Sequence, residues 1–148
     1  MTTTAVLKSQ NPSSTPGSPN GADDRHKLQT VARCVLGVFL IGAGISHLSW
    51  ARNSFQAQVP DWVPVDPDAV VLLSGVAEIG LGLALLGVRS KWTGWVVGAF
   101  FVAVFPGNIS QFVHHRNAFG LNTDTRRAVR LLFQPVLVAW AVWSTSEH

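Results

Sequence analysis

The sequence predicts an all-α membrane protein, a four-transmembrane-helix bundle with a disordered N-terminal tail. Two observations carry this prediction. First, 47% of the 148 residues are hydrophobic and only 13% are charged, whereas about 25% of the residues of a soluble domain are charged. Second, the apolar residues are concentrated in four blocks, each close to the roughly 20 residues that a helix needs to cross a bilayer. These blocks are continuous apolar runs without alternation, so they indicate helices and not the strands of a barrel.

The four blocks define the expected spans, which lie at residues 31–48, 69–88, 92–113 and 128–144. The second and third are the clearest. The first carries Arg33 near its start, and the fourth contains Arg130, Gln134 and Pro135. We still expect the fourth to be a span, because its run VLVAWAVW is too apolar for an exposed chain end. The sequence therefore predicts one transmembrane domain over residues 31–148.

Residues 1–30 differ from the rest, because they are rich in Ser, Thr, Pro, Asn and Gly. Such a segment buries too little apolar surface to offset its chain entropy, so we expect a disordered polar tail. It does not resemble a secretory signal peptide, since no apolar run follows a basic start within it. The span at residues 31–48 is therefore expected to be retained.

The location and the partners follow less directly. Four spans place both termini on one side, but the basic residues near the spans are equally divided between the two sides and do not decide the orientation. We expect a multi-pass protein of the bacterial plasma membrane with cytoplasmic termini, because a polar tail that is not translocated is the simpler arrangement. The net charge of +3 does not indicate a nucleic-acid partner. The basic residues are scattered beside the apolar spans, where lipid headgroups are their ordinary neighbours.

Cysteine and histidine usage excludes two kinds of chemistry. Cys34 is the only cysteine, whereas dithiol exchange needs an attacking and a resolving thiol. No Cys/His spacing resembles a zinc site, so we predict no metal site.

The polar residues of the spans are expected to gather in one half of the membrane. With alternating helix directions, His47 ends the first span on the far side, and Glu78 lies roughly 14 Å below that surface at 1.5 Å per residue. The far halves of the third and fourth spans contribute Asn108, Gln111, Arg130 and Gln134. The half nearer the tail is expected to hold no such set.

Helical spacing adds detail to this cluster. Ser74, Glu78 and Gly82 are four residues apart and form one stripe, and small residues beside Glu78 favour close helix approach. Gly94 and Gly98 form a GxxxG contact on the third span. Pro106 is expected to kink that span.

A loop between the first two spans, SWARNSFQAQVPDWVPVDPD, has three prolines and carries Trp62. Because it lies on the same side as the polar cluster, we expect it to cover the cluster as a lid.

An ionisable residue inside a membrane is by default a candidate functional residue. We therefore assign Glu78 and His47 as candidate catalytic residues. The candidate binding residues are Asn108, Gln111, Arg130, Gln134, Ser74 and Trp62. The competing interpretation is that Glu78 bonds Asn108 or a backbone carbonyl and only holds helices together.

Five motifs carry a resemblance to a known family: GAGISHL, VPDWVP, SGVAEIGLGLALL, VFPGNISQFVHH and RLLFQPVLVAWAVW. Together they resemble the DoxX-like family of small four-helix integral membrane proteins. Members of that family more often have Phe after the His and Ala before the Asn, where this chain has Leu48 and Gly107. The resemblance implies the fold, and it implies an association with membrane oxidoreductase complexes and a quinone-like ligand.

Three functions remain open at this stage. The chain is a subunit of a membrane redox complex that holds a quinone-like or other lipophilic small molecule, or a stand-alone enzyme that uses Glu78 as general acid or base, or a non-catalytic scaffold or assembly factor. The cofactor is unknown, with a quinone as the candidate. The expected partners are the lipid bilayer, redox-complex subunits and a lipophilic molecule. A homodimer is a further candidate partner, and an exporter function would require it.

Overall fold

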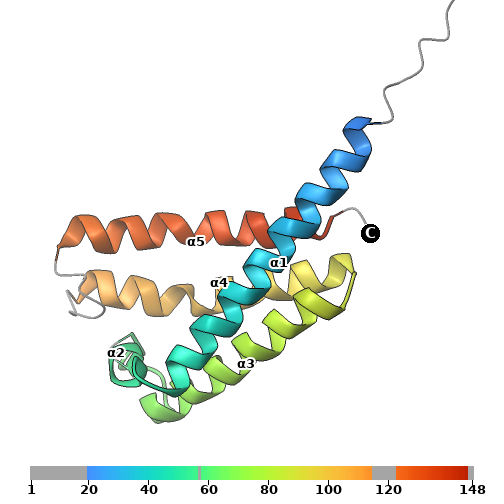
Figure 1. Ribbon diagram of the computed structural model, residues 1–148. Coiled ribbons are helices and arrows are strands. Elements are labelled where there is room, and N and C mark those ends of the chain that lie inside the picture. The colour runs from blue at the N-terminus through green and yellow to red at the C-terminus, as the bar shows by residue number, and fades with distance from the viewer. Residues whose placement is uncertain (1–19, 57, 115–122, 147–148) are drawn as a thin grey trace, which may run out of the picture.

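The computed structural model describes residues 20–56, 58–114 and 123–146, which form helices joined by turns and loops and contain no strand. Five helices follow one another: α1 (Asn20–Leu48), α2 (Arg52–Gln56), α3 (Pro67–Gly87), α4 (Lys91–Val113) and α5 (Asp124–Ser144) (Figure 1). The all-α prediction is thus confirmed. Three of the described helices, α1, α3 and α4, are long and apolar enough to cross a membrane, and α5 contains a shorter apolar stretch over Ala128–Ser144.

Helix α1 begins well before the predicted start at residue 31. Residues 20–30, expected in the disordered tail, belong to this helix. The exposed pair Lys27 Nζ and Asp23 Oδ2, 2.6 Å apart, is an i,i+4 contact that supports a helix. Gln29 is buried and donates to the backbone oxygen of Trp143 at 3.0 Å. Residues 1–19, the other part of the predicted tail, lie outside the described residues.

Local sequence signals set the ends of α3 and α4. Asp66 is the N-cap of α3 and accepts from the N–H of Ala69, and Pro67 occupies the first turn, where its missing N–H costs nothing. Ser90 is the N-cap of α4 and accepts from Trp92. Pro106 lies inside α4, which remains helical from Lys91 to Val113. The expected kink therefore does not end the helix.

The helices pack as two antiparallel pairs, α1 with α3 and α4 with α5 (Figure 1). Glycines allow the backbones of the first pair to touch. A Cβ added at Gly44 would lie 2.5 Å from the oxygen of Gly75, and one at Gly82 would lie 2.6 Å from the oxygen of Gly37. Gly37 and Gly44 on α1, and Gly75 and Gly82 on α3, repeat every seven residues, so this glycine seam holds α1 and α3 together over two turns.

The second pair has its own close contact. A Cβ on Gly94 of α4 would lie 2.6 Å from the backbone oxygen of Ala141 on α5, whereas one on Gly98 would only reach ordinary contact distance. The two pairs share a small core near the middle of the molecule, and its buried members are Leu36, Leu40, Leu85, Val97, Phe101, Leu137 and Ala141.

The end of the molecule nearer the N-terminus also buries polar side chains, contrary to prediction. Arg33 is 2% exposed and donates from Nη1 to the backbone oxygen of Val88, 3.1 Å away, at the C-cap of α3. A cation at this position is favoured by the negative end of the helix dipole. Gln29, Ser144 and Thr145 are buried at the same end. These side chains bond to backbone carbonyls near the helix ends, so they stabilise helix packing at this end of the molecule.

Large apolar side chains cover the outer faces of all four long helices. Examples are Val38 on α1, Leu73 on α3, Val102 on α4 and Leu132 on α5, each more than half exposed. A soluble monomer rarely exposes apolar surface on this scale. The outer surface is therefore consistent with a lipid bilayer as its environment.

Candidate functional site

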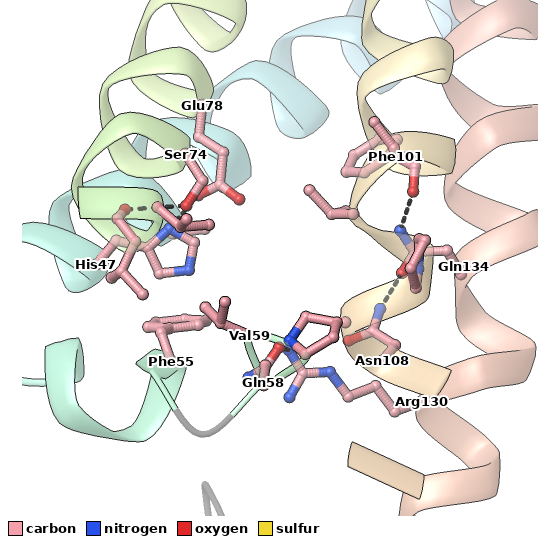
Figure 2. Close-up of a pocket in the computed structure, with 18 of the residues that line it drawn as sticks. His47, Phe55, Gln58, Val59, Ser74, Glu78, Phe101, Asn108, Arg130 and Gln134 are labelled. Carbon is pink, nitrogen blue, oxygen red and sulfur yellow. Dashed lines mark hydrogen bonds and ion pairs between the residues drawn. The ribbon is translucent and has the colours of Figure 1, made fainter. Parts of the chain in front are cut away.

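A cavity of about 550 Å³ lies between the two helix pairs. Its walls are mostly apolar, with Phe39 and Leu40 from α1, Val70 from α3, and Phe133 and Leu137 from α5. Figure 2 shows its polar side chains on two sides: His47, Ser74 and Glu78 face Asn108, Arg130 and Gln134, and Phe55, Gln58 and Val59 lie between them at one end. The volume is in the range that holds a small organic molecule.

His47 and Glu78 form a buried pair on the first wall. His47 ends α1 and is 6% exposed, and Glu78 lies in the middle of α3 and is 8% exposed. Nδ1 of His47 is 3.1 Å from Oε2 of Glu78, close enough for an ion pair when the imidazole is protonated. The two atoms are not aligned as a hydrogen bond, and neither they nor His47 Nε2 bond to any other described residue. The pair thus presents hydrogen-bonding capacity that the described protein does not use.

The glycine seam places this pair. Gly75 packs directly on His47, since a Cβ there would lie 2.8 Å from the Cβ of His47. The buried stripe of α3 is Val71, Gly75, Glu78, Gly82 and Leu85. Ser74, predicted in that stripe, is only partly buried; it lines the cavity and donates from its hydroxyl to the backbone oxygen of Val71 at 2.9 Å.

Helix α2 closes the cavity beside His47. The ring of Phe55 meets the imidazole edge-to-face, with an interplanar angle of 88°. Arg52 makes a forked contact with the carboxylate of Asp68, and Gln56 Nε2 donates to the same carboxylate at 2.6 Å. The hydrogen bonds to Asp68 raise the pKa of Arg52 above its usual value. This contact ties α2 to the first turn of α3, as expected of a covering loop.

Replacing Arg52 by Gln should loosen this cover. The forked contact is lost while α1 and α3 keep their glycine seam, so the change is confined to α2. Amide hydrogen exchange of residues 52–56 should become faster, and the exchange of α3 should stay as it is. Arg89→Gln, at an exposed position at the other end of α3, is the control and should leave α2 unchanged. If residues 52–56 exchange at the same rate in Arg52→Gln as in the wild type, the Arg52–Asp68 ion pair does not hold α2 in place.

Gln134 organises the second wall. Its Oε1 accepts from Asn108 Nδ2 at 2.8 Å, and its Nε2 donates to the backbone oxygen of Phe101 at 2.6 Å. Asn108 and Gln134 are both buried. The amide of Gln134 thus joins α5 to α4 at two points, and part of the predicted polar cluster serves helix packing.

Gln134→Leu should therefore lower stability. It leaves the Asn108 amide without its acceptor and removes a donor from the Phe101 carbonyl, at a cost of about 1–3 kcal/mol. Thermal unfolding in detergent measures the loss. The double variant Asn108→Leu/Gln134→Leu should recover part of it, because both ends of the bond are then apolar. Additive losses in the double variant would contradict this coupling.

Arg130 is the cation of the second wall. Its Nη2 donates to Gln58 Oε1 at 3.1 Å, and its Nη1 to Gln111 Oε1 at 3.5 Å. Arg130 and Gln58 both line the cavity, whereas Gln111 is buried outside it. Arg130 therefore faces Glu78 across the cavity, and it bonds to one amide of the covering loop and one of α4.

Most of the residues proposed from the sequence meet at this one cavity. His47, Glu78, Ser74, Asn108, Arg130, Gln134 and Trp62 line it. Trp62 is 73% exposed, so it lies at the rim. Of the partners expected for Glu78, His47 is the one with a described contact to it. Asn108 bonds to Gln134, and Arg130 bonds to Gln111 and to Gln58 of the covering loop.

Gln58, which bonds to Arg130, and Phe55, which contacts His47, were not among the candidate site residues, although Phe55 was expected as an apolar residue of the covering loop. Both belong to the loop between the first two spans, where helix periodicity gives no register. Gln58 contacts Arg130, which is 72 positions away in the sequence. The sequence of the loop alone does not predict such a long-range contact.

No group of three or more His, Cys, Asp or Glu side chains that could hold a metal ion occurs among residues 20–56, 58–114 and 123–146. The polar groups that line the cavity are the His47–Glu78 pair, a guanidinium, amides and a hydroxyl.

Comparison with known proteins gives a family without an assigned activity. No curated protein and no solved structure matches the chain. The family described as "Domain of unknown function (DUF8561)" matches residues 36–145, which include the cavity and all four long helices in whole or in part. The chain belongs to this family of unknown function, DUF8561.

Proposed function

We propose that the chain is an integral membrane protein that holds a quinone-like lipophilic molecule in the cavity, as a subunit of a membrane redox complex. The observation that carries this proposal is the buried His47–Glu78 pair, whose Nδ1 and Oε2 are 3.1 Å apart on the wall of a mostly apolar cavity of about 550 Å³. A pocket of this size with few polar groups suits an apolar body and a small polar headgroup.

In this proposal α5 completes a four-span bundle. Gln29 near the start of α1 bonds to the backbone of Trp143 near the end of α5, which supports both termini lying on one side of the membrane. We assign that side to the cytoplasm of a bacterial cell, with the cavity in the opposite half of the bilayer. The ligand would reach the cavity from the lipid, because apolar side chains form the outer faces of the helices around it.

The His47–Glu78 pair suits a ligand that gains and loses protons. Reduction of a quinone to a quinol consumes two electrons and two protons. An imidazole and a carboxyl group are both side chains that serve as general acids and bases. In the proposal this pair supplies protons to the headgroup, and partner subunits of the redox complex supply the electrons. The resemblance to the DoxX-like family supports the association with such a complex.

Binding by the purified full-length chain tests this function. Native mass spectrometry in detergent should show a 1:1 complex with 1,4-naphthoquinone. Ala43→Phe places a ring in the cavity, since Ala43 lines it, and should abolish the complex. Ala99→Phe, at an exposed position of α4 outside the cavity, is the matched control and should bind as the wild type does. Equal binding by both variants would locate the quinone elsewhere.

A second candidate function follows from the same pair. A carboxyl group and an imidazole in contact form an acid–base couple, so the chain would act alone on a lipophilic substrate with Glu78 as general acid or base. Turnover by the purified chain without added subunits would favour this candidate. A scaffold or assembly role predicts that binding-site variants reduce function only through lower protein levels.

A further inference from the structure

Arg130 fixes the orientation of the Gln58 side-chain amide. An arginine side chain only donates hydrogen bonds, so the atom of Gln58 that lies 3.1 Å from Arg130 Nη2 is the carbonyl oxygen, Oε1. The NH₂ end of the amide therefore points away from the guanidinium. Gln58 lines the cavity, and its Nε2 is buried and bonds to no described residue.

The unused donor of Gln58 has a counterpart on the other side of the cavity. His47 Nε2 is also buried without a hydrogen bond to the described residues. Figure 2 shows His47 and Glu78 on the α1–α3 side, and Gln58 beside Arg130 toward the other side. Buried polar groups are normally hydrogen-bonded, so two unused groups on one cavity indicate a bound molecule that reaches both.

We infer that Gln58 is a second recognition residue, and that the ligand carries two oxygen functions on opposite sides of its headgroup. One accepts a hydrogen bond from Gln58 Nε2, and the other bonds to His47. The inference rests on the proposed function and narrows it to headgroups such as 1,4-quinones. The two contacts differ in kind, because the amide of Gln58 only donates toward the cavity, whereas His47 donates or accepts according to its protonation.

Gln58→Glu tests this contact without changing the shape of the side chain. The carboxylate keeps an oxygen for Arg130, which holds it ionised, and replaces the donor by an acceptor. A quinone carbonyl then meets an acceptor, whereas the hydroxyl of the quinol donates to it. Calorimetry with the purified chain should show binding of 1,4-naphthoquinone weakened about tenfold or more, with anaerobic 1,4-naphthalenediol bound about as in the wild type.

Gln29→Glu is the matched control, because Gln29 is a buried amide at the opposite end of α1 and does not line the cavity. It places a carboxylate in a buried position away from the cavity, and it should leave the quinone-to-quinol preference unchanged. Gln58→Leu removes the donor without adding charge, and it should weaken quinone binding about five- to tenfold.

The outcomes separate this inference from the proposed function. Wild type that binds the quinone, with Gln58→Glu and Gln58→Leu binding both ligands as wild type does, overturns the role of Gln58 and leaves the proposed function standing. Wild type that binds neither ligand overturns the proposed function and the inference with it. A shift from quinone toward quinol in Gln58→Glu that the control variant lacks, together with weaker quinone binding by Gln58→Leu, supports both.

Discussion

Glu78→Gln should reduce quinone reduction by native membranes about 100-fold or more, while the protein accumulates at its wild-type level. The amide has nearly the same volume as the carboxyl group, so the packing of α3 against α1 is kept. It cannot exchange a proton with the His47 imidazole, whose Nδ1 is 3.1 Å from Glu78 Oε2. A positioned acid–base group contributes typically about 10²- to 10⁴-fold to such a step. Turnover in membranes that carry the variant as the only copy measures the loss, and immunoblotting measures the protein level.

Two further variants identify the cause of that loss. Glu78→Asp keeps an ionisable group and should retain part of the activity. Asp23→Asn removes a carboxylate that is exposed and paired only with Lys27 among the described contacts, and it should have no effect on turnover. A Glu78→Gln protein that fails to accumulate, with activity lost in proportion, would favour the scaffold function over proton exchange.

Gly44→Ala should destabilise the protein by about 1–3 kcal/mol, the cost of over-packing a tight contact. The added Cβ would lie 2.5 Å from the Gly75 backbone oxygen and 2.7 Å from a side-chain carbon of Ile79. A backbone oxygen of a packed helix cannot move alone, so α1 and α3 must separate. Since Gly75 also packs on His47, the separation should displace His47 from Glu78 and weaken ligand binding. Thermal unfolding in detergent and calorimetry with 1,4-naphthoquinone measure the two effects.

Gly42→Ala is the matched control on the same helix. A Cβ at Gly42 meets nothing within 4 Å, and alanine in a helix interior is favoured over glycine by roughly 0.5–1 kcal/mol. This variant should therefore be as stable as the wild type or slightly more stable. If Gly44→Ala and Gly42→Ala unfold at the same temperature, the backbone contact between α1 and α3 does not stabilise the protein as we propose.

Much of this fold could be predicted because the apolar blocks are long and continuous. The spans at residues 69–88 and 92–113 coincide with α3 and α4 to within about two residues, since Asp66 with Pro67 and Ser90 mark their starts. The start of α1 was missed because residues 20–30 are polar. Their helix is stabilised by pairs such as Asp23–Lys27 and by the contact of Gln29 with Trp143, which hydropathy does not report.

Much of the polar lining of the cavity could be predicted, although Gln58 was missed and Gln111 lies outside it, and the pairing of the side chains could not be predicted. Helix direction alone placed His47, Glu78, Asn108, Arg130 and Gln134 in one half of the molecule. It could not show that the helices separate into two pairs, so that Glu78 contacts His47 while Asn108 contacts Gln134. The pairing of α1 with α3 depends on the glycine seam. Gly37 and Gly44 on α1 lie against Gly82 and Gly75 on α3, which brings the two backbones together.

The most direct test of the central claim is photo-crosslinking with a diazirine-bearing 1,4-naphthoquinone in liposomes, followed by peptide mapping. The claim is that the space between the two helix pairs, bordered by His47 and Glu78, is the binding site. It predicts labels on cavity residues such as Phe39, Val70 and Phe133, which excess unlabelled quinone prevents and which Ala43→Phe abolishes. Labels confined to outward-facing residues such as Leu73 and Val102, and unaffected by unlabelled quinone, would contradict it.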